Sequence, residues 1–461
     1  MTQEEFSVEA LQRVPVAEGV LSVLAVLFSE ERMSALFEKH RGASYQRTLS
    51  FHRLVELMYS AVLEHNAVGS QAFDSARKAN AMPVSDQAAY GKIGRMRQSL
   101  SHAIISESMA PLMEMFPECV KTRVPMCFNK YNVYGIDGKK LKDIGKRLLE
   151  TRGTPGKLLG GKTLVALSIH EQLVVAMSSA LDGEANDGPL VPDLLASVHA
   201  RTPTLNIFLA DAQFCDLTTP RRILNYGSDF VMRYHPKVHF HVDNDVPAVH
   251  GKDGWDRPYV EEIGWLGNPE KKSSIRVRRI VVKREGKPDL IIVTSLLDSK
   301  KFSAADVLEL YGLRWTIETA FLHVTKEFDL RHMIGSTAEA TIFQFSISLM
   351  IYNVMKLIQA HASESQGVSP EEISLPKIIR SAKKEMISLS IFVPTELIAD
   401  LILDKRPTPA RMLKLLSKLW DDDWIKAPKN NRNPKPPPKK RSGAHTSVYR
   451  EIKAYNERKD V

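Results

Sequence analysis

Apolar residues recur at three- and four-residue spacing through residues 1–125, which is the pattern of amphipathic helices. The run Phe51, Leu54, Val55, Met58 and Val62 shows this spacing. Stretches in which polar and apolar residues alternate are scarce in this part of the chain. We therefore predict a helical N-terminal domain over residues 1–125.

A basic segment lies near the end of this helical region. Ser85 begins a predicted helix, and Lys92, Arg95 and Arg97 follow between apolar positions. A basic helix of this kind can lie on DNA as part of a helix-turn-helix. A solvated face of a bundle helix has the same pattern, and both interpretations stay open.

From Tyr131 the apolar period changes from helical to extended. The almost wholly apolar run 205–210 is typical of a buried central strand. The pattern predicts an α/β region in the order β-β-β-α-β-α-β. The predicted strands cover residues 132–137, 164–169, 173–177, 205–210 and 230–234, and the helices cover 191–201 and a segment that begins at Thr219.

Residues 235–301 form a second β-rich block. Within it, 275–282 and 290–293 are joined through Glu285-Gly286-Lys287-Pro288 and predict a hairpin. Ser303 then caps one long predicted helix that runs through Tyr311, Arg314 and Glu318. Further helices are expected to about Trp424, which gives a helical C-terminal region over 351–425.

The charge of the chain is concentrated at its C-terminal end. Residues 426–461 hold eleven basic and three acidic residues, which is +8 of the formal net charge of +9. The prolines and lysines of 427–442 cannot bury enough apolar surface to fold alone, so we expect this segment to be disordered until DNA is bound. Because the rest of the chain is nearly neutral, its charge does not identify its function.

Composition and segment lengths exclude several other classes of protein. Hydrophobic residues make up 43% of the chain, as in ordinary globular proteins, and the longest apolar stretches fall short of the ~20 residues of a membrane span. The N-terminus has no secretory signal pattern, so we expect a cytoplasmic protein without a membrane partner. Cys119, Cys127 and Cys215 lack paired spacing, and we interpret them as structural.

Three carboxylates stand at informative places in this pattern. Asp137 ends the first predicted strand, Asp211 follows the fourth, and Glu318 is on the helix after the β-rich block. Cleavage of a phosphodiester by a two-metal mechanism needs carboxylates that converge on Mg²⁺ or Mn²⁺, because hard cations take oxygen ligands. If the strands pair in one sheet and the helix packs across it, the three residues meet.

The residues around these carboxylates give a specific resemblance. Asp137-Gly138, Asp211-Ala212-Gln213-Phe214 and Tyr311-x-x-Arg314-x-x-x-Glu318 resemble the three signature blocks of the insertion-sequence-four family of bacterial DDE transposases. The likeness covers roughly residues 131–351.

The resemblance implies a ribonuclease H-like catalytic core over 126–234 and 302–350, interrupted by a β-rich insertion at 235–301. It also implies two Mg²⁺ or Mn²⁺ ions held by Asp137, Asp211 and Glu318, and double-stranded DNA as the partner. The expected activity is cleavage of the inverted-repeat ends of an insertion sequence followed by strand transfer. A homodimer and a DNA-end-binding role for residues 1–125 are expected with it.

The third block has physical support and one departure from the family pattern. At about 100° per residue, Tyr311, Arg314 and Glu318 share one helix face, where Arg314 and Tyr311 can bind a phosphate. An Arg–Glu pair on a surface helix is the alternative for an isolated helix. The family has a lysine seven positions after the glutamate, but Thr325 stands there; Lys326 follows it, about 80° off the glutamate face, and its contact with DNA stays open.

Several other residues are candidates for contact with DNA. Trp315 matches an Arg-Trp pair of the family. Trp255 and Trp265 are candidates to stack on an extruded base, with core packing as the alternative. Arg276 and Arg278 share a strand face and suit phosphate contacts, or form a solvated face.

A histidine-rich segment is a weaker candidate for a metal site. It holds His235, His239 and His241, with Asp243 close by. Polar or DNA-facing positions on the insertion fit these residues better than metal ligation.

Two other functions remain compatible with the sequence. One is a catalytically inactive relative that binds DNA, and the other is a stand-alone nuclease of the same fold. The complete set of carboxylates favours the transposase.

Overall fold

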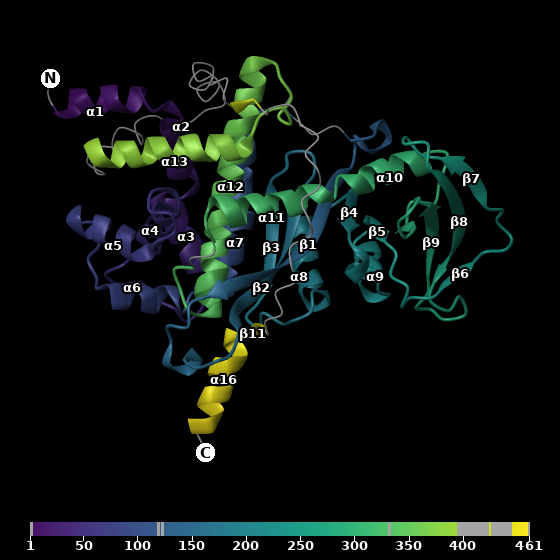
Figure 1. Cartoon of the computed structure of the whole chain (residues 1–461), viewed down its shortest axis with the longest axis horizontal. Helices are drawn as coiled ribbons and strands as arrows, with labels where there is room; N and C mark the ends of the chain where they lie inside the picture. The colour runs from purple at the N-terminus through teal and green to yellow at the C-terminus, as the bar shows by residue number, and fades with distance from the viewer. Residues whose placement is uncertain are drawn as a thin grey trace.

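The structure is a computed structural model that describes residues 3–117, 120, 124–330, 333–393, 424–425 and 445–459. Figure 1 shows helices at one end of the long axis, a sheet in the centre and a β-rich block at the other end. The helix α12 (Ala338–Gln366) stands between the helical end and the sheet.

The N-terminal region is helical, as predicted. Serine side chains cap α3, α4 and α6. In α4, for example, the Ser50 side chain accepts a hydrogen bond from the backbone N–H of Arg53 at 3.1 Å. The predicted apolar run from Phe51 to Val62 is buried on this helix. The helices are α1 (Gln3–Gln12), α2 (Pro15–Leu27), α3 (Glu30–His40), α4 (Phe51–Leu63), α5 (Gly69–Lys78), α6 (Asp86–Ile93) and α7 (Gln98–Glu114).

The predicted basic helix is shorter than expected. Ser85 caps α6 as predicted, with its side chain accepting from the N–H of Ala88 at 3.3 Å. The helix ends at Ile93, however, so Arg95 and Arg97 lie in the turn before α7. Of the three predicted DNA-binding cations, only Lys92 is on the helix.

A mixed sheet forms the centre of the molecule, and the predicted order β-β-β-α-β-α-β is confirmed. β1 pairs antiparallel with β2 and parallel with β4, and β4 pairs parallel with β5. The elements are β1 (Asn132–Ile144), β2 (Lys157–Ser168), β3 (Val174–Ala180), α8 (Val191–Arg201), β4 (Asn206–Ala210), α9 (Thr218–Asn225) and β5 (Asp229–Arg233). The protein therefore has a mixed α/β fold.

The β-rich block of residues 235–301 extends this sheet. Its strands are β6 (Phe240–Val242), β7 (Val249–Lys252), β8 (Pro258–Leu266), β9 (Ile275–Val282) and β10 (Leu290–Thr294). The predicted hairpin is β9–β10, and β10 pairs antiparallel with β5. One continuous sheet thus runs from the centre of the molecule into the β-rich end.

The predicted long helix after Ser303 is in fact two helices. Ser303 caps α10 (Ala304–Gly312), as expected, by accepting from the N–H of Asp306 at 3.1 Å. At Leu313 and Arg314 the backbone bonds become i to i−3, the tighter 3₁₀ pattern, before α11 (Trp315–Glu327) begins. α10 and α11 still run nearly end to end in Figure 1.

α12 is the core helix of the molecule. Thr337 caps it at 3.2 Å, and Gly367 ends it in the left-handed conformation. The helix is long and apolar enough to cross a membrane, but its most apolar window is entirely buried inside the fold, as in the core helix of a globular protein. It packs on the N-terminal helices, on the sheet and on α13 (Leu375–Phe392).

The hydrophobic core runs without a break across the predicted boundary near residue 125. Buried side chains of α2, α4, α7, β1, β4, α11 and α12 belong to one cluster. Cys215 is buried within it and Cys127 packs against it, both as free thiols, while Cys119 lies outside the described residues.

The C-terminal segment returns to the sheet. β11 (His445–Ser447) pairs parallel with β2 at the sheet edge, and α16 (Val448–Lys459) follows it. The Arg450 guanidinium pairs with Asp182 at 2.8 Å and with Glu184. The predicted disordered segment 427–442 lies outside the described residues.

Candidate functional site

Strand pairing brings Asp137 and Asp211 to neighbouring positions. β1 and β4 pair in parallel with Gly135 opposite Leu209. Asp137 and Asp211 each follow this last pair by two residues, so they lie toward the same end of two neighbouring strands. Asp211 ends β4 and caps a short 3₁₀ turn, where its Oδ1 accepts from the N–H of Gln213 at 2.8 Å.

One face of β1 packs against α11 and adds Glu318 to the site. A Cβ atom at Gly135 would lie 3.7 Å from the Ile317 side chain, so the helix approaches the strand closely at this point. Since side chains alternate along a strand, Asp137 and Lys139 lie on the same face as Gly135. Glu318 follows Ile317 and interacts electrostatically with Asp137.

Asp137 is influenced by the charges of the other two carboxylates. Burial raises the pKa of Asp137 to about 6, and the charges of Asp211 and Glu318 raise it as well. The N–H of Gly138, which donates to Asp137 Oδ1 at 2.8 Å, and the Arg314 charge oppose this increase. A carboxylate in this position is destabilised by its neighbours and would be stabilised by an added cation.

Gly138 makes room for a second charge pair beneath the strand. A Cβ atom at position 138 would lie 2.2 Å from Asp187 Oδ1, so any side chain would displace Asp187. Asp187 Oδ1 in turn lies 2.9 Å from Lys162 Nζ, and both side chains are buried. The glycine of the Asp-Gly motif is therefore required by packing against Asp187.

Arg314 lies between the aromatic rings of Tyr311 and Trp315. Its guanidinium carbon is 5.8 Å from the centre of the Tyr311 ring and 5.7 Å from that of Trp315. Its Nη2 donates to Glu318 Oε1 at 2.7 Å, and the residue is 6% exposed. Tyr311 is buried, whereas Trp315 is 62% exposed and open to a ligand.

The Arg314–Glu318 contact shows that the 3₁₀ turn preserves the predicted arrangement of the third block. The predicted grouping of Tyr311, Arg314 and Glu318 thus persists across the break between α10 and α11. The pair is half-buried beside Asp137, so it is not the exposed Arg–Glu pair of an isolated surface helix.

The donor chemistry of this site suits a divalent cation. Asp137, Asp211 and Glu318 offer the oxygen ligands that Mg²⁺ and Mn²⁺ prefer. In the described part of the chain, however, no three His, Cys, Asp or Glu side chains are close enough to hold one ion. Glu318 is turned toward Arg314, so it would have to exchange that partner for a cation.

The lysine expected after Glu318 is absent from the site. At position 325, the Thr hydroxyl donates to the carbonyl oxygen of Phe321 at 2.7 Å, and Lys326 is exposed in the last turn of α11. A different lysine occupies the face of Asp137. The Lys139 ammonium lies 5.5 Å from the centre of the Phe321 ring on α11.

The structure contradicts one predicted DNA contact in the β-rich block. Arg278 is fully buried, pairs with Glu261 at 2.8 Å and donates to the Phe302 carbonyl oxygen at 2.6 Å. A guanidinium enclosed in this way cannot reach a phosphate outside the protein. The prediction failed because strand alternation gives a side chain's face but not what covers that face.

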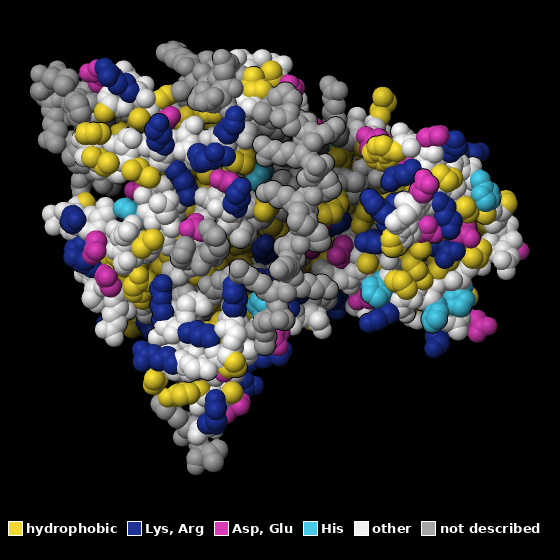
Figure 2. Space-filling model, viewed as in Figure 1, with side chains coloured by type: hydrophobic (Ala, Val, Ile, Leu, Met, Phe, Trp, Pro, Cys, Tyr) yellow, Lys and Arg dark blue, Asp and Glu magenta, His cyan; other side chains and the backbone are white. Residues whose placement is uncertain are grey.

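The other predicted residues of this block lie nearer the surface. The exposed Arg276 side chain pairs with Asp243 at 2.9 Å and stacks on Trp265, 5.2 Å from its ring centre. Trp255 is 64% exposed, with Arg257 over its ring at 4.8 Å. His235, His239 and His241 form no metal cluster among the described residues. Figure 2 shows Lys and Arg side chains here mixed with Asp, Glu and His.

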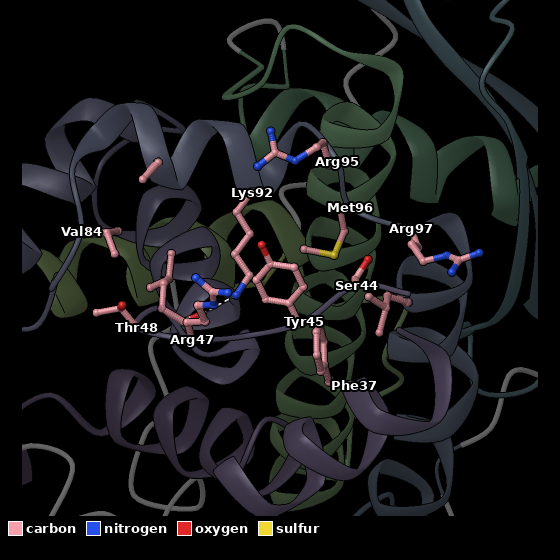
Figure 3. Close-up of a pocket in the computed structure, with 13 residues that line it drawn as sticks. Phe37, Ser44, Tyr45, Arg47, Thr48, Val84, Lys92, Arg95, Met96 and Arg97 are labelled. Carbon is pink, nitrogen blue, oxygen red and sulfur yellow. Dashed lines mark hydrogen bonds between the residues drawn. The ribbon is translucent and has the colours of Figure 1, made fainter. Parts of the chain in front are cut away.

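A basic pocket of about 350 Å³ lies in the helical region and gathers the three cations predicted there. Lys92, Arg95 and Arg97 line it with Arg47 and Tyr45, and no acidic residue lines it. In Figure 3 the Arg47 and Lys92 side chains converge beside the Tyr45 ring, while Arg95 and Arg97 lie farther out. The Arg47 guanidinium is 4.9 Å from the centre of that ring.

The cations of this pocket differ from other basic residues of the helical region. Arg53 and Arg77 each pair with an acidic residue of the same helix, and Arg13, just after α1, pairs with Glu9 of that helix. Among the ion pairs of the described residues, none includes a cation of the pocket; Lys92 donates to the Leu49 carbonyl oxygen instead. The pocket therefore presents positive charge that a carboxylate does not neutralise.

Reasoning from the sequence missed Lys139, Asp187, Arg47 and Tyr45. The spacing of two between Asp137 and Lys139 could have identified the lysine, because such positions share a strand face. Tyr45 and Arg47 stand in a loop without periodicity, and only the folded chain brings them to Lys92. No local pattern links Asp187 to Gly138.

One of the comparisons with known proteins covers the elements of this site. The family model described as the transposase DDE domain matches residues 126–354, which include β1, β4 and α11. A cryo-EM structure of a piggyBac transposase synaptic complex with hairpin DNA is similar over 88% of both chains, at 11% identity and a TM-score of 0.41. That likeness is too weak to carry over fold or activity. The search of the curated proteins found no match. The family match supports a DDE transposase.

Proposed function

We propose that this protein is a DNA transposase of the insertion-sequence-four type with a ribonuclease H-like core. It binds the inverted-repeat ends of its own mobile element as a homodimer, cuts them and joins them to target DNA. The observation that supports this most directly is that Asp137 on β1 is influenced by the charges of Asp211, which follows the neighbouring strand β4, and of Glu318 on α11.

The proposed site holds Mg²⁺ or Mn²⁺ through Asp137, Asp211 and Glu318. Divalent cations at such a site stabilise the attacking and leaving oxygens of a phosphodiester. The raised pKa of Asp137 is consistent with this role, because a cation would offset the repulsion from Asp211 and Glu318. Arg314, freed from Glu318, binds a phosphate oxygen of the DNA through its planar guanidinium. Trp315 covers the outer side of that guanidinium.

The basic pocket at Arg47, Lys92, Arg95 and Arg97 is the proposed contact of the helical region with DNA. Phosphate oxygens bind most strongly to cations that no carboxylate already neutralises, and these four meet that condition. The cations of the β-rich block are less suited, because Arg276, Arg278 and Arg279 are each paired with an acidic residue. The exposed Trp255 remains a candidate to stack on a base.

The decisive experiment is cleavage of end DNA. The substrate is a duplex that carries the DNA flanking the coding sequence, incubated with Mg²⁺ or Mn²⁺ and the purified full chain. Wild type should nick the duplex and form joined products, whereas Asp137→Ala, Asp211→Ala and Glu318→Ala should each be inactive while still binding it. Full activity in any of the three variants would remove the proposed site.

The same experiment separates the two alternative functions. Salt-dependent binding of the ends without nicking, even in Mn²⁺, would identify a catalytically inactive DNA-binding relative. Cleavage without joined products would identify a stand-alone nuclease of this fold. Joined products that depend on all three carboxylates fit the transposase alone.

A further inference from the structure

Lys139 is placed to reach whatever Asp137 binds. The two residues are successive on the face of β1 that packs against α11, about 7 Å apart along the strand. Their charges interact. On the helix, Phe321 lies one turn beyond Glu318, and the Lys139 ammonium lies over its ring at 5.5 Å. Strand and helix thus hold the ammonium on the Asp137 face of β1, over the Phe321 ring of α11.

The nearby cations on these elements have other partners or face elsewhere. Arg314 pairs with Glu318 at 2.7 Å, and the buried Lys162 pairs with Asp187 at 2.9 Å. Lys140 is exposed and on the opposite face of β1 from Asp137. Lys139 is partly buried, and among the ion pairs of the described residues none includes it.

The helix itself supplies no lysine at this point. Thr325 is bonded to the backbone of Phe321, and the exposed Lys326 stands at the C-terminal end of α11, where a cation complements the helix dipole. DNA entering the site brings phosphate charges next to three carboxylates. A cation on the strand lowers that repulsion.

We propose that Lys139 is a phosphate-binding residue of the active site, which holds the DNA phosphodiester beside Asp137 with the ammonium guided by the Phe321 ring. This inference rests on the proposed function, since it takes DNA as the ligand of the site. Lys139 on β1 would then take the role of the lysine that the family pattern places on the helix of Glu318, α11. Lys326 then has no part in holding the phosphate.

The test measures DNA binding without metal, in EDTA, over a range of salt concentrations. The key variant is Lys139→Met, which keeps the apolar stem over Phe321 and removes the charge. It should bind the flanking-DNA duplex about tenfold more weakly. The slope of log affinity against log salt should fall by about 1, the share of one phosphate contact.

Lys139→Arg should restore the slope because it restores the charge. Lys140→Ala and Lys326→Ala are the matched controls, from the opposite strand face and from the helix end, and both should bind like wild type. Thermal unfolding of each variant confirms that the fold is intact.

Cleavage by the same variants in Mg²⁺ separates this inference from the proposed function. If wild type cuts the duplex and Asp137→Ala does not, the proposed function stands, and Lys139→Met should cut at least about tenfold more slowly. If Lys139→Met then binds DNA with the affinity and salt slope of wild type and cuts it as fast, the proposed role of Lys139 is wrong while the proposed function stands. A loss in Lys326→Ala in place of Lys139→Met would overturn it too. Failure of wild type to bind or cut would overturn both proposals together.

Discussion

At the scale of single residues, Asp137 shows that the candidate site is kept at the expense of stability. Its pKa is raised from 3.8 to about 6, so the folded protein holds this proton more tightly than the unfolded chain does. Above pH 6 the carboxylate is charged in both states, and the folded state carries the full penalty. As the pH falls from 6 toward 4, the Asp137 carboxylate is protonated in the folded state, and this loss of stability disappears.

Asp137→Asn should therefore stabilise the protein while abolishing cleavage. The amide keeps an oxygen for the Gly138 N–H and loses the charge, so the free energy of unfolding should rise by about 3 kcal/mol at about pH 8. The gain should vanish at about pH 4, where the wild-type carboxyl is protonated. Urea unfolding at the two pH values measures both effects.

The exposed Asp245 provides the control for this variant, because Asp245→Asn should leave stability unchanged. Mg²⁺ should narrow the difference between wild type and Asp137→Asn, since a cation bound only by the native carboxylates stabilises wild type. A gain that is the same at both pH values would show that Asp137 is not strained by charge.

How far the sequence could predict the site is visible in these same residues. Asp137, Asp211 and Glu318 stand in ordered motifs, and the sequence correctly placed Asp137 on the first strand, Asp211 directly after the fourth and Glu318 on a later helix. The burial of Arg278 was not predictable, because it depends on Glu261 one strand away and on the Phe302 carbonyl oxygen in a later loop. Side-chain type and spacing do not contain such long-range contacts.

At the scale of elements, the sequence located strands and helices well but misjudged where some of them end. β1 was predicted to end at Asp137, yet it continues to Ile144, because pairing with β2 tolerates the polar residues after Gly138. The long helix predicted through Arg314 is divided by a 3₁₀ turn directly after Gly312, a residue that often ends helices and that the helical pattern alone did not take into account. Both differences fall at the candidate site, where tertiary contacts prevail over local preference.

The basic pocket, formed where the α3–α4 loop meets α6 and the turn after it, gives a prediction about DNA binding. Arg47→Ala with Arg95→Ala removes two of its cations, and neither of them is in an ion pair within the described part of the chain. The slope of log affinity against log salt for duplex DNA should fall by about 2, and by a similar amount for unrelated sequences, because phosphate contacts carry no sequence information. Fluorescence anisotropy over a salt series measures it.

A matched double variant from the same helical region tests whether position matters as well as charge. Arg13→Ala with Arg77→Ala also removes two positive charges, but each guanidinium is paired with an acidic residue. Its slope should stay close to that of wild type. Equal losses in the two double variants would refute a specific role for the pocket.

At the scale of the whole molecule, the C-terminal segment is part of the folded body. Val448 is fully buried with Ile144, Leu158 and Ala338, and β11 extends the sheet beside β2. The composition of residues 426–461 did not indicate this packing, because the lysines and prolines before residue 445 dominate that composition. The predicted domain boundaries likewise missed that one core joins the helical region to the sheet.

Val448→Asp should release this segment from the sheet. A charge in that buried position should cost about 2 kcal/mol or more, and the amides of β11 should exchange with solvent faster than in wild type. Tyr449→Asp, at a neighbouring position that is 41% exposed, is the control and should leave the exchange slow. Fast exchange of these amides in the unaltered protein would show instead that the segment is not held by Val448.

The buried position of α12 also determines when the protein can mature. Residues 338–366 leave the ribosome only after the N-terminal helices and the strands β2 and β3 on which they pack. Until then, the apolar faces of α2, α4 and α7 lack one of their partners, so we expect the helical region not to complete its core before α12 is made. A chain that ends before α12 should therefore leave these apolar faces exposed and be more readily cleaved by a protease than the full chain.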